Sequence, residues 1–131
     1  ADIVHVGQED LPVREVRRIA GAAMLVGKST HSIEQFEAAL AEEPDYLTMG
    51  PMFPTATKPQ TYQPGPSVLS EVARRSPLPI GAIGGITPRS SPQIMAAGAS
   101  CLCVCSAVIS ADDPESAARA ILAQIAARSG C

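Results

Sequence analysis

Residues 80–88, IGAIGGITP, have the layout of a strand, a tight turn and the start of a helix. Four small or aliphatic residues come first, and two glycines then allow the backbone to turn sharply and to approach a ligand. Thr87 and Pro88 follow as a cap residue with proline in the first helical position. The segment therefore predicts one strand–helix unit of an α/β protein.

The same layout recurs along the whole chain. Apolar runs at residues 3–6, 23–26, 46–49 and 101–105 are each followed by a polar or glycine-containing turn and then by apolar residues at helical spacing. The inward-facing residues predicted for the first, second, third and fifth helices are Val13, Val16 and Ala20; Ile33, Phe36 and Leu40; Val68, Leu69 and Val72; and Ala117, Ile121, Leu122 and Ile125. Ser32 and Gln35 have capping-box spacing, the third helix is expected from about Ser67, and Asp113 with Pro114 precedes the fifth.

The apolar runs do not alternate with polar residues, which is typical of strands that are covered on both faces of a parallel sheet. The fold class is therefore α/β with parallel strands, in a single domain over residues 1–131. Two architectures fit: an open doubly wound sheet of five strands, or part of an eight-stranded barrel. In both, ligands bind at the carboxyl ends of the strands.

Composition argues for a small-molecule ligand. The formal net charge is −3 and the ten basic residues are scattered, so neither nucleic acid nor an anionic membrane is an expected partner. No apolar run approaches the length of a membrane span and the start has no signal-peptide layout, which predicts a cytoplasmic protein. The start at Ala1, directly before a strand, suggests that the sequence begins at a cut.

Four cysteines stand at positions 101, 103, 105 and 131, and the first three alternate as they would on one face of a strand. We expect buried, reduced thiols that act as small hydrophobic groups. A trithiolate metal cluster is the alternative, but no CxxC pair or neighbouring histidine supports it.

The first strand end, HVGQEDLP, offers Gln8, Glu9 and Asp10. Asp10 is placed either to cap the helix that contains Pro12 or to act as a carboxylate ligand for a hard cation such as Mg²⁺. Both interpretations stay open on spacing alone.

The second and third strand ends carry hydroxyl and cationic groups. VGKSTHS places Lys28, Ser29, Thr30 and His31 after the second run. GPMFPTATKP, residues 50–59, holds three prolines that restrict the loop, so that its threonines and lysine can contact an anion at a lower entropy cost than in an ordinary loop. A rigid solvated connection is the alternative.

The fourth and fifth ends, GAIGGITP and VCSAV, follow neighbouring strands. In barrels, the loops after the last two strands commonly close on one phosphate, and exposed amides at a helix start favour an anion. These two loops fit that role if they belong to the last two strands of a barrel.

Together, HVGQEDLP, GKSTHS, DYLTMGPMFPTATKP, AIGGITP and SAVISADDPESAAR resemble the thiamine phosphate synthase family over essentially the whole chain. The resemblance implies a partial (β/α)8 TIM barrel of five consecutive units that begins at the fourth strand. The family's first three units are absent, with their pyrimidine-binding and second metal-binding segments. The edges of an incomplete barrel would be unpaired, so we expect the missing units to come from a longer chain or from self-association.

The resemblance also implies an activity: coupling of 4-amino-5-hydroxymethyl-2-methylpyrimidine diphosphate with hydroxyethylthiazole phosphate to give thiamine phosphate and pyrophosphate, with Mg²⁺. It implies the following roles: Asp10 as a Mg²⁺ ligand; Ser29 and Lys58 on the diphosphate; and Thr55, Ala56, Thr57, Gly85, Cys105 and Ser106 on the thiazole phosphate.

Two departures from the family pattern are visible. Lys28 stands where the family often has valine or arginine, and either reinforces diphosphate binding or faces solvent. Ser100 and Cys101 replace a frequent Asp-Gly pair.

Two other functions stay open: a thiazole tautomerase-like isomerase that uses a histidine such as His31, and a truncated remnant that binds phosphate without catalysis.

Overall fold

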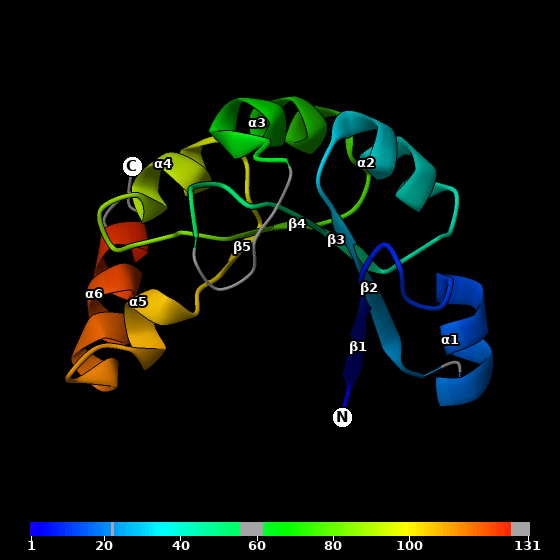
Figure 1. Cartoon of the computed structure of the whole chain (residues 1–131), viewed down its shortest axis with the longest axis horizontal. Coiled ribbons are helices and arrows are strands. Elements are labelled where there is room, and N and C mark those ends of the chain that lie inside the picture. Colours follow the sequence, from blue (N-terminus) through cyan, green and yellow to red (C-terminus); the bar gives the residue numbers. More distant parts are fainter. Residues whose placement is uncertain (22, 56–61, 127–131) are drawn as a thin grey trace.

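The computed structural model describes residues 1–21, 23–55 and 62–126. Five strands form one parallel sheet: β1 (Ile3–Val6), β2 (Leu25–Thr30), β3 (Tyr46–Met49), β4 (Ile80–Ile83) and β5 (Cys101–Cys103). The helices are α1 (Val13–Ala20), α2 (Ile33–Leu40), α3 (Gly65–Arg75), α4 (Ser91–Ala96), α5 (Ser106–Ile109) and α6 (Pro114–Ala126) (Figure 1). None of these helices is long and apolar enough to cross a membrane.

The strands lie in the sheet in their order along the chain, β1-β2-β3-β4-β5, and every neighbouring pair is parallel. A doubly wound sheet reverses its strand order at a switch point, whereas a barrel keeps it. The sequential order therefore excludes the doubly wound alternative within the described residues and confirms five consecutive units of a barrel-like fold.

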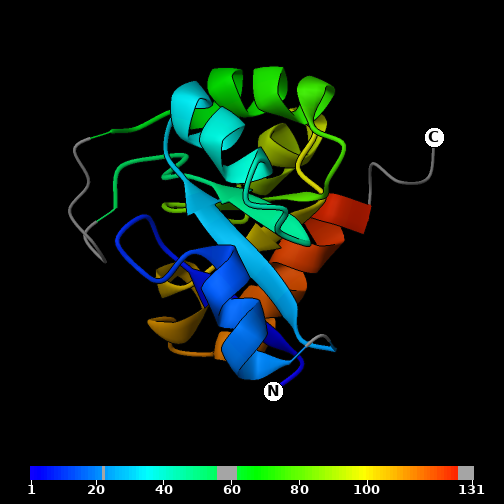
Figure 2. The same ribbon diagram turned by 90° about the vertical axis from the view of Figure 1, so that its right-hand side faces the viewer.

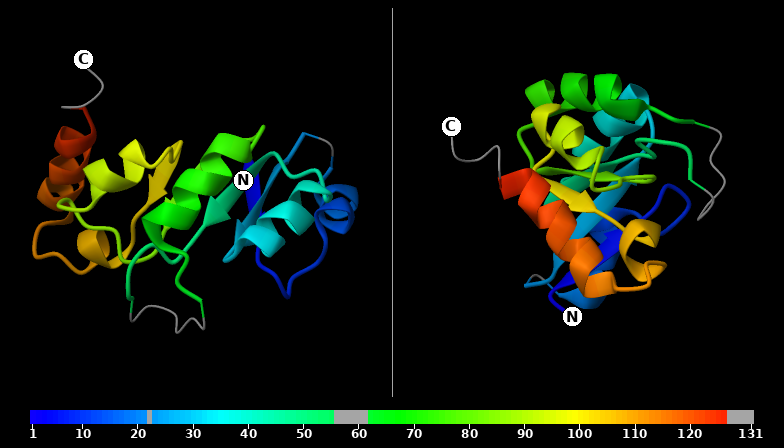
Figure 3. Two further views of the ribbon diagram at one scale, coloured as in Figure 1. Left: turned by 90° about the horizontal axis from the view of Figure 1, so that it is seen from above. Right: turned by 90° about the vertical axis from the view of Figure 1, so that its left-hand side faces the viewer.

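One face of the sheet carries the hydrophobic core. Leu47 and Met49 of β3 are fully buried, and they pack with Phe36 of α2 and Leu69 and Val72 of α3. Helices α2, α3 and α4 lie along this side of the sheet (Figure 2), while α1 and α6 lie at opposite ends of the molecule (Figure 3, left). A second, smaller cluster joins Val6 and Val26 to α1.

The opposite face of the sheet, called here the inner face, is not covered by any helix among the described residues. Ile3, Leu25 and Ile83 point to it and are 49%, 47% and 42% exposed. The cysteines of β5 belong to the same face: Cys101 is exposed and Cys103 is half-buried. The prediction of buried thiols is thus wrong, because this face has no packing layer here, although the thiols of Cys101, Cys103 and Cys105 are free as expected.

Three strands have the predicted bounds, and β2 does not. The prediction placed this strand at residues 23–26, but it runs from Leu25 to Thr30, because Gly27 to Thr30 pair in register with β3. Lys28 therefore lies inside a strand and is only 6% exposed. The Lys28 side chain does not face solvent, and it does not line the cleft at the strand ends where a diphosphate would bind. Both interpretations offered for Lys28, solvent exposure and diphosphate binding, are therefore wrong.

Smaller differences follow from local geometry. Strand β5 ends at Cys103, and Ser106 begins the unpredicted helix α5. The fourth helix begins at Ser91, because Thr87 and Ser90 close a separate turn through their backbone and hydroxyl groups. Leu122 was expected to face inward but is 64% exposed, since Ile121 occupies the inward position and neighbouring helical residues differ by about 100°.

Glu42 connects three elements on the helix-covered side. Its carboxylate lies 2.6 Å from the Lys28 ammonium of β2 and accepts a 3.0 Å hydrogen bond from the Val13 amide at the start of α1. Burial alone would raise the pKa of Glu42, but these hydrogen bonds outweigh it, and the pKa lies below its usual 4.5. The ion pair and the helix terminus thus stabilise each other.

We predict that Glu42→Gln destabilises the protein by about 1–3 kcal/mol, less than for a fully buried ion pair, because the buried Lys28 ammonium loses its counter-charge but the Glu42 side chain is 30% exposed. Urea unfolding of the variant and of Glu43→Gln, the same change at the exposed neighbouring position, measures the difference. Since the folded-state pKa of Glu42 is lowered, its stabilisation is present above pH 4.5 and is lost as the pH falls through the folded value. Equal stability of the two variants at neutral pH would contradict this role.

Candidate active site

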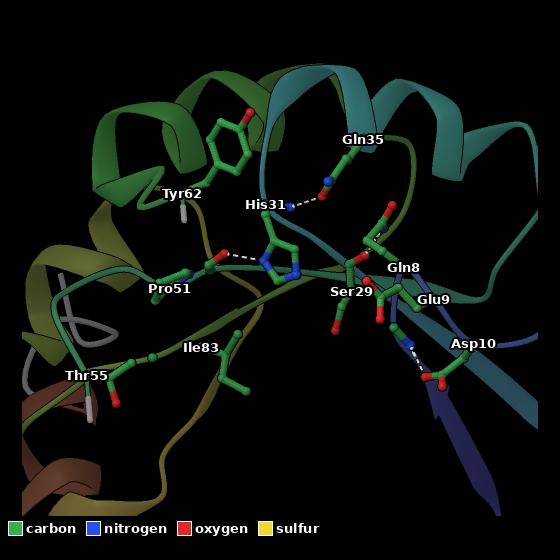
Figure 4. Close-up of a pocket in the computed structure, with 13 residues that line it drawn as sticks. Gln8, Glu9, Asp10, Ser29, His31, Gln35, Pro51, Thr55, Tyr62 and Ile83 are labelled. Carbon is green, nitrogen blue, oxygen red and sulfur yellow. Dashed lines mark hydrogen bonds between the residues drawn. The ribbon is translucent and has the colours of Figure 1, made fainter. Parts of the chain in front are cut away.

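A cleft of about 610 Å³ opens at the carboxyl ends of β1 to β4 (Figure 4). This is the edge at which parallel α/β folds bind ligands. Its lining comes from four loops or strand ends: Gly7, Gln8, Glu9 and Asp10; Ser29, His31 and Gln35; Gly50, Pro51, Thr55 and Tyr62; and Ile83 and Gly84.

The β1 loop is closed by Asp10. The Gly7 amide donates a 2.6 Å hydrogen bond to one Asp10 carboxylate oxygen, and the Gln8 side-chain amide donates to the Ser29 carbonyl at 2.5 Å. The N-terminal cap of α1 is Pro12, and the Val13 amide is satisfied by Glu42, so Asp10 does not cap this helix. The capping interpretation is wrong, and the exposed Asp10 carboxylate lies at the rim of the cleft.

Ser29 lies at the end of β2 and lines the cleft from the inner face. Its hydroxyl is 2.8 Å from His5 Nε2 and 3.3 Å from the Thr48 hydroxyl, while His5 Nδ1 is 2.9 Å from the Tyr46 hydroxyl. Partial burial of the His5 ring lowers its pKa below the usual 6.5, although the residue as a whole is exposed, and the Asp10 carboxylate partly offsets this shift; burial raises the pKa of Tyr46 above 10. The imidazole is therefore neutral and the phenol protonated at pH 7.

His31 follows β2 and lies between Pro51 and Ser29 in Figure 4. Its Nδ1 lies 2.6 Å from the Gly50 carbonyl, and its backbone amide donates to the Gln35 side-chain oxygen at 2.8 Å. Because a carbonyl only accepts, Nδ1 must carry a hydrogen. The expectation that His31 is available to a ligand stays a prediction, and its Nε2 is the ring nitrogen that remains for one.

The loops after β3 and β4 are held against each other by backbone contacts. The Met52 amide donates to the Ile83 carbonyl at 2.9 Å, and the Phe53 amide donates to the Gly84 carbonyl at 3.1 Å. A side chain would not fit between the loops: a Cβ on Gly84 would lie 2.5 Å from the Pro51 Cβ, and one on Gly85 would lie 2.8 Å from Phe53. Both glycines also have positive φ, 94° and 65°.

The structure brings together part of the predicted site. Asp10, Ser29 and Thr55 line this same cleft, whereas Gly85, Cys105 and Ser106 do not line it. Gly85 adjoins the lining residue Gly84, and Ser106 begins α5 after the next strand. Ala56, Thr57 and Lys58 lie outside the described residues.

Sequence reasoning missed His5 and Tyr46, because neither lies at the carboxyl end of its strand: His5 is inside β1, and Tyr46 is the first residue of β3. A polar ring in the middle of the apolar run IVHV was a signal for His5. Nothing local marked Tyr46, because its contact with His5 depends on strand register: His5 pairs with Gly27, and Gly27 pairs with Tyr46.

Comparison with known proteins agrees with this geometry. The family model for thiamine monophosphate synthase matches residues 1–108. The chain belongs to this family. It is 48% identical over 120 residues to a thiamine-phosphate synthase of Mycobacterium sp. (strain KMS), and 45% identical over 122 residues to one of Synechococcus sp. (strain WH7803).

The chain covers only part of these proteins. The alignments take in 91% and 93% of the chain but 53% of the Mycobacterium protein and 35% of the Synechococcus protein. Among solved structures, the thiamine phosphate pyrophosphorylase of Pyrococcus furiosus superposes with a TM-score of 0.89 at 29% identity, over 97% of this chain and 60% of that one. A 3-hexulose-6-phosphate synthase shares the fold, with a TM-score of 0.72 at 21% identity.

We predict that Gly84→Ala destabilises the protein more than Gly21→Ala. The two glycines have nearly the same φ, 94° and 90°, so both substitutions carry backbone strain of about 1–3 kcal/mol. Only Gly84 also faces a clash with Pro51, since nothing lies within 4 Å of a Cβ on Gly21. Urea unfolding should show an additional loss of roughly 1–3 kcal/mol for Gly84→Ala. A smaller loss than for Gly21→Ala would show that the two loops are not held this closely.

Proposed function

We propose that this chain forms one part of the active site of a thiamine phosphate synthase, a transferase that joins the pyrimidine diphosphate and the thiazole phosphate. The observation that carries the proposal is the cleft that gathers Asp10, Ser29 and Thr55 from three strand ends of a member of this family. These are a carboxylate for a cation and hydroxyls for phosphate oxygens. A small-molecule reaction of this kind is compatible with the cytoplasmic location that the sequence suggested.

The pyrimidine diphosphate would bind at the β2 side of the cleft. Ser29 donates to its phosphate oxygens, and Lys58, outside the described residues, supplies a cation. During the reaction the bond between the pyrimidine methylene carbon and the diphosphate oxygen breaks, and the thiazole nitrogen bonds to that carbon. The bonding pair leaves with pyrophosphate, so donors placed at the leaving oxygens stabilise the transition state most.

The thiazole phosphate would bind nearer to the β3, β4 and β5 ends. Thr55 lines the cleft from the β3 loop and would contact this phosphate, with the Gly85 amide and the backbone of Cys105 and Ser106 on the other side. Ala56 and Thr57, outside the described residues, are proposed as further contacts. The close packing of Gly84 against Pro51 supports this arrangement, because it holds the β3 and β4 loops at a fixed separation. No general base is needed from this chain, since the nucleophile is a ring nitrogen of the substrate.

Mg²⁺ is proposed as the cofactor, with Asp10 as one ligand. The donor set fits a hard cation: Asp10 is an exposed carboxylate at the cleft rim, with one oxygen engaged by the Gly7 amide and Glu9 beside it. The described residues contain no cluster of three or more acidic, histidine or cysteine ligands, so substrate oxygens would complete the coordination, as is usual for this ion. When bound, Mg²⁺ neutralises charge on the diphosphate.

The exposed inner face of the sheet is proposed to be an interface with further barrel units. Its exposed Ile3, Leu25 and Ile83, together with the edges of β1 and β5 that pair with no strand among the described residues, would be covered by further barrel units of a longer chain or by a second copy. Such units would supply the remaining wall of the pyrimidine site.

The experiment that tests the function is an assay of the native gene product with both substrates and Mg²⁺. Formation of thiamine phosphate with an equal amount of pyrophosphate, followed by chromatography and phosphorus NMR, is the expected result. Isomerisation of the thiazole phosphate without pyrophosphate would establish the tautomerase instead. Binding of phosphate with neither reaction would establish the non-catalytic remnant.

We predict that Asp10→Asn raises the Mg²⁺ concentration needed for half-maximal pyrophosphate binding about tenfold or more, because a neutral amide replaces a charged ligand. Isothermal titration at several Mg²⁺ concentrations measures the shift. Asp112→Asn, an exposed aspartate after α5, is the control and should leave the requirement unchanged. Binding of the thiazole phosphate should be nearly intact in Asp10→Asn; equal loss of both ligands would overturn the assignment.

A further inference from the structure

His5, Ser29, Tyr46 and Thr48 form a connected hydrogen-bond network on the inner face, and only Ser29 of these four lines the cleft. Gly27 makes the network possible. A Cβ at this position would lie 2.0 Å from Tyr46 Cζ, so the absence of a side chain lets the tyrosine ring cross β2 and reach His5. The two rings lie 5.5 Å apart between centroids.

The network has two possible directions, because a neutral imidazole carries one donor and one acceptor nitrogen. In one tautomer, Nδ1 donates to Tyr46 and Nε2 accepts the Ser29 proton, which turns that proton away from the cleft. In the other, Tyr46 donates to Nδ1 and Nε2 donates to the Ser29 oxygen. A phenol is more acidic than an aliphatic hydroxyl, so it is the better donor, and this favours the second direction.

Thr48 finds a partner in either direction, and in the second direction it completes the hydrogen bonding of Ser29. It is 4% exposed, and the partners found for its hydroxyl are the Ser29 hydroxyl at 3.3 Å and His5 Nε2 at 3.4 Å. If Nε2 carries the hydrogen, the Thr48 hydroxyl donates to Ser29. Ser29 then accepts from both His5 and Thr48, which occupies both of its lone pairs. Its own proton has to point elsewhere, and the open side is the cleft.

We propose that His5 and Tyr46 are positioning residues that fix the Ser29 hydroxyl as a donor toward the cleft, so that this end of the site selects an anionic oxygen. The inference rests on the proposed function for the identity of that anion, a diphosphate. The inference goes beyond the proposed function because it assigns the direction of the hydrogen bonds behind Ser29. That direction is a property of the protein with or without a bound ligand.

The pKa directions agree with this assignment. Burial holds the pKa of His5 below 6.5, with Asp10 as the charged group that opposes the shift, so the ring is neutral and Nδ1 can accept. Burial, with a smaller contribution from Cys103 and Cys101, raises the pKa of Tyr46, so its hydroxyl keeps the proton that it donates.

The direct test is nitrogen NMR of the ligand-free protein labelled with 15N-histidine, at weakly alkaline pH. The chain has two histidines, and they should show opposite tautomers: hydrogen on Nε2 in His5, and hydrogen on Nδ1 in His31, whose Nδ1 faces the Gly50 carbonyl. His31→Gln assigns the signals. Hydrogen on Nδ1 of His5 would overturn the inference whether or not the protein binds pyrophosphate.

The second test is a double-mutant cycle on binding of pyrophosphate with Mg²⁺ to the native gene product. Tyr46→Phe removes the hydrogen bond to Nδ1 and should weaken binding about three- to tenfold, although Tyr46 does not line the cleft. Ser29→Ala should weaken it about tenfold or more, and the double variant should be no weaker than Ser29→Ala alone. Ser67→Ala, an exposed serine of α3, is the control for an unrelated hydroxyl.

The outcomes distinguish the positioning role of His5 and Tyr46 from the proposed transferase function. Additive losses in the cycle would show that Tyr46 acts only on the fold, which would overturn the positioning role while the transferase proposal stands. Absence of pyrophosphate binding in the unsubstituted protein would overturn the proposed function, and the tautomer of His5 would still decide the direction of the network.

Discussion

Sequential parallel pairing is the constraint on which the rest of this structure depends. Each strand pairs with the next one along the chain, in parallel, so each intervening helix returns on the same side of the sheet. As a consequence all five carboxyl ends meet at one edge. Loops that are far apart in sequence then lie side by side there, and Asp10, Ser29, Thr55 and Gly84 line one cleft.

Side chains alternate between the two faces of the sheet along each strand, so one face packs against the helices and the other contributes to the cleft. Lys28 and Ser29 are neighbours in sequence, yet Lys28 is buried toward the helices and paired with Glu42, while Ser29 faces the cleft. A buried ammonium paired with a carboxylate holds α1 against β2, and the hydroxyl next to it is left for a ligand. A shift of β2 by one residue would exchange these positions, which is why the register matters for the site as well as for the core.

Much of the fold could be predicted from the sequence, because β1, β3 and β4 are short apolar runs bounded by turn residues. Strand β2 could not, because Gly27, Lys28 and Ser29 have low intrinsic preference for strands. Their conformation is decided by partners elsewhere in the chain: the backbone of β3, and the carboxylate of Asp45, which accepts from the Val26 amide at 2.7 Å. The site shows the same limit. Residues at strand ends were identifiable from their chemistry, whereas the contact of Tyr46 with His5 follows only from register across three strands.

Three glycines at and behind the cleft act in two different ways. Gly84 and Gly85 bring two backbone segments together, so they control the distance between loops and leave the side chains of those loops free to vary. Gly27 instead leaves room for a side chain from the next strand, so it controls which residues can form a network behind Ser29. A substitution at Gly84 would therefore change the shape of the cleft, whereas one at Gly27 would displace Tyr46 and change the hydrogen bonding of the cleft with its outline nearly intact. The loop glycines thus affect where a ligand fits, whereas the strand glycine affects which hydrogen bonds it meets.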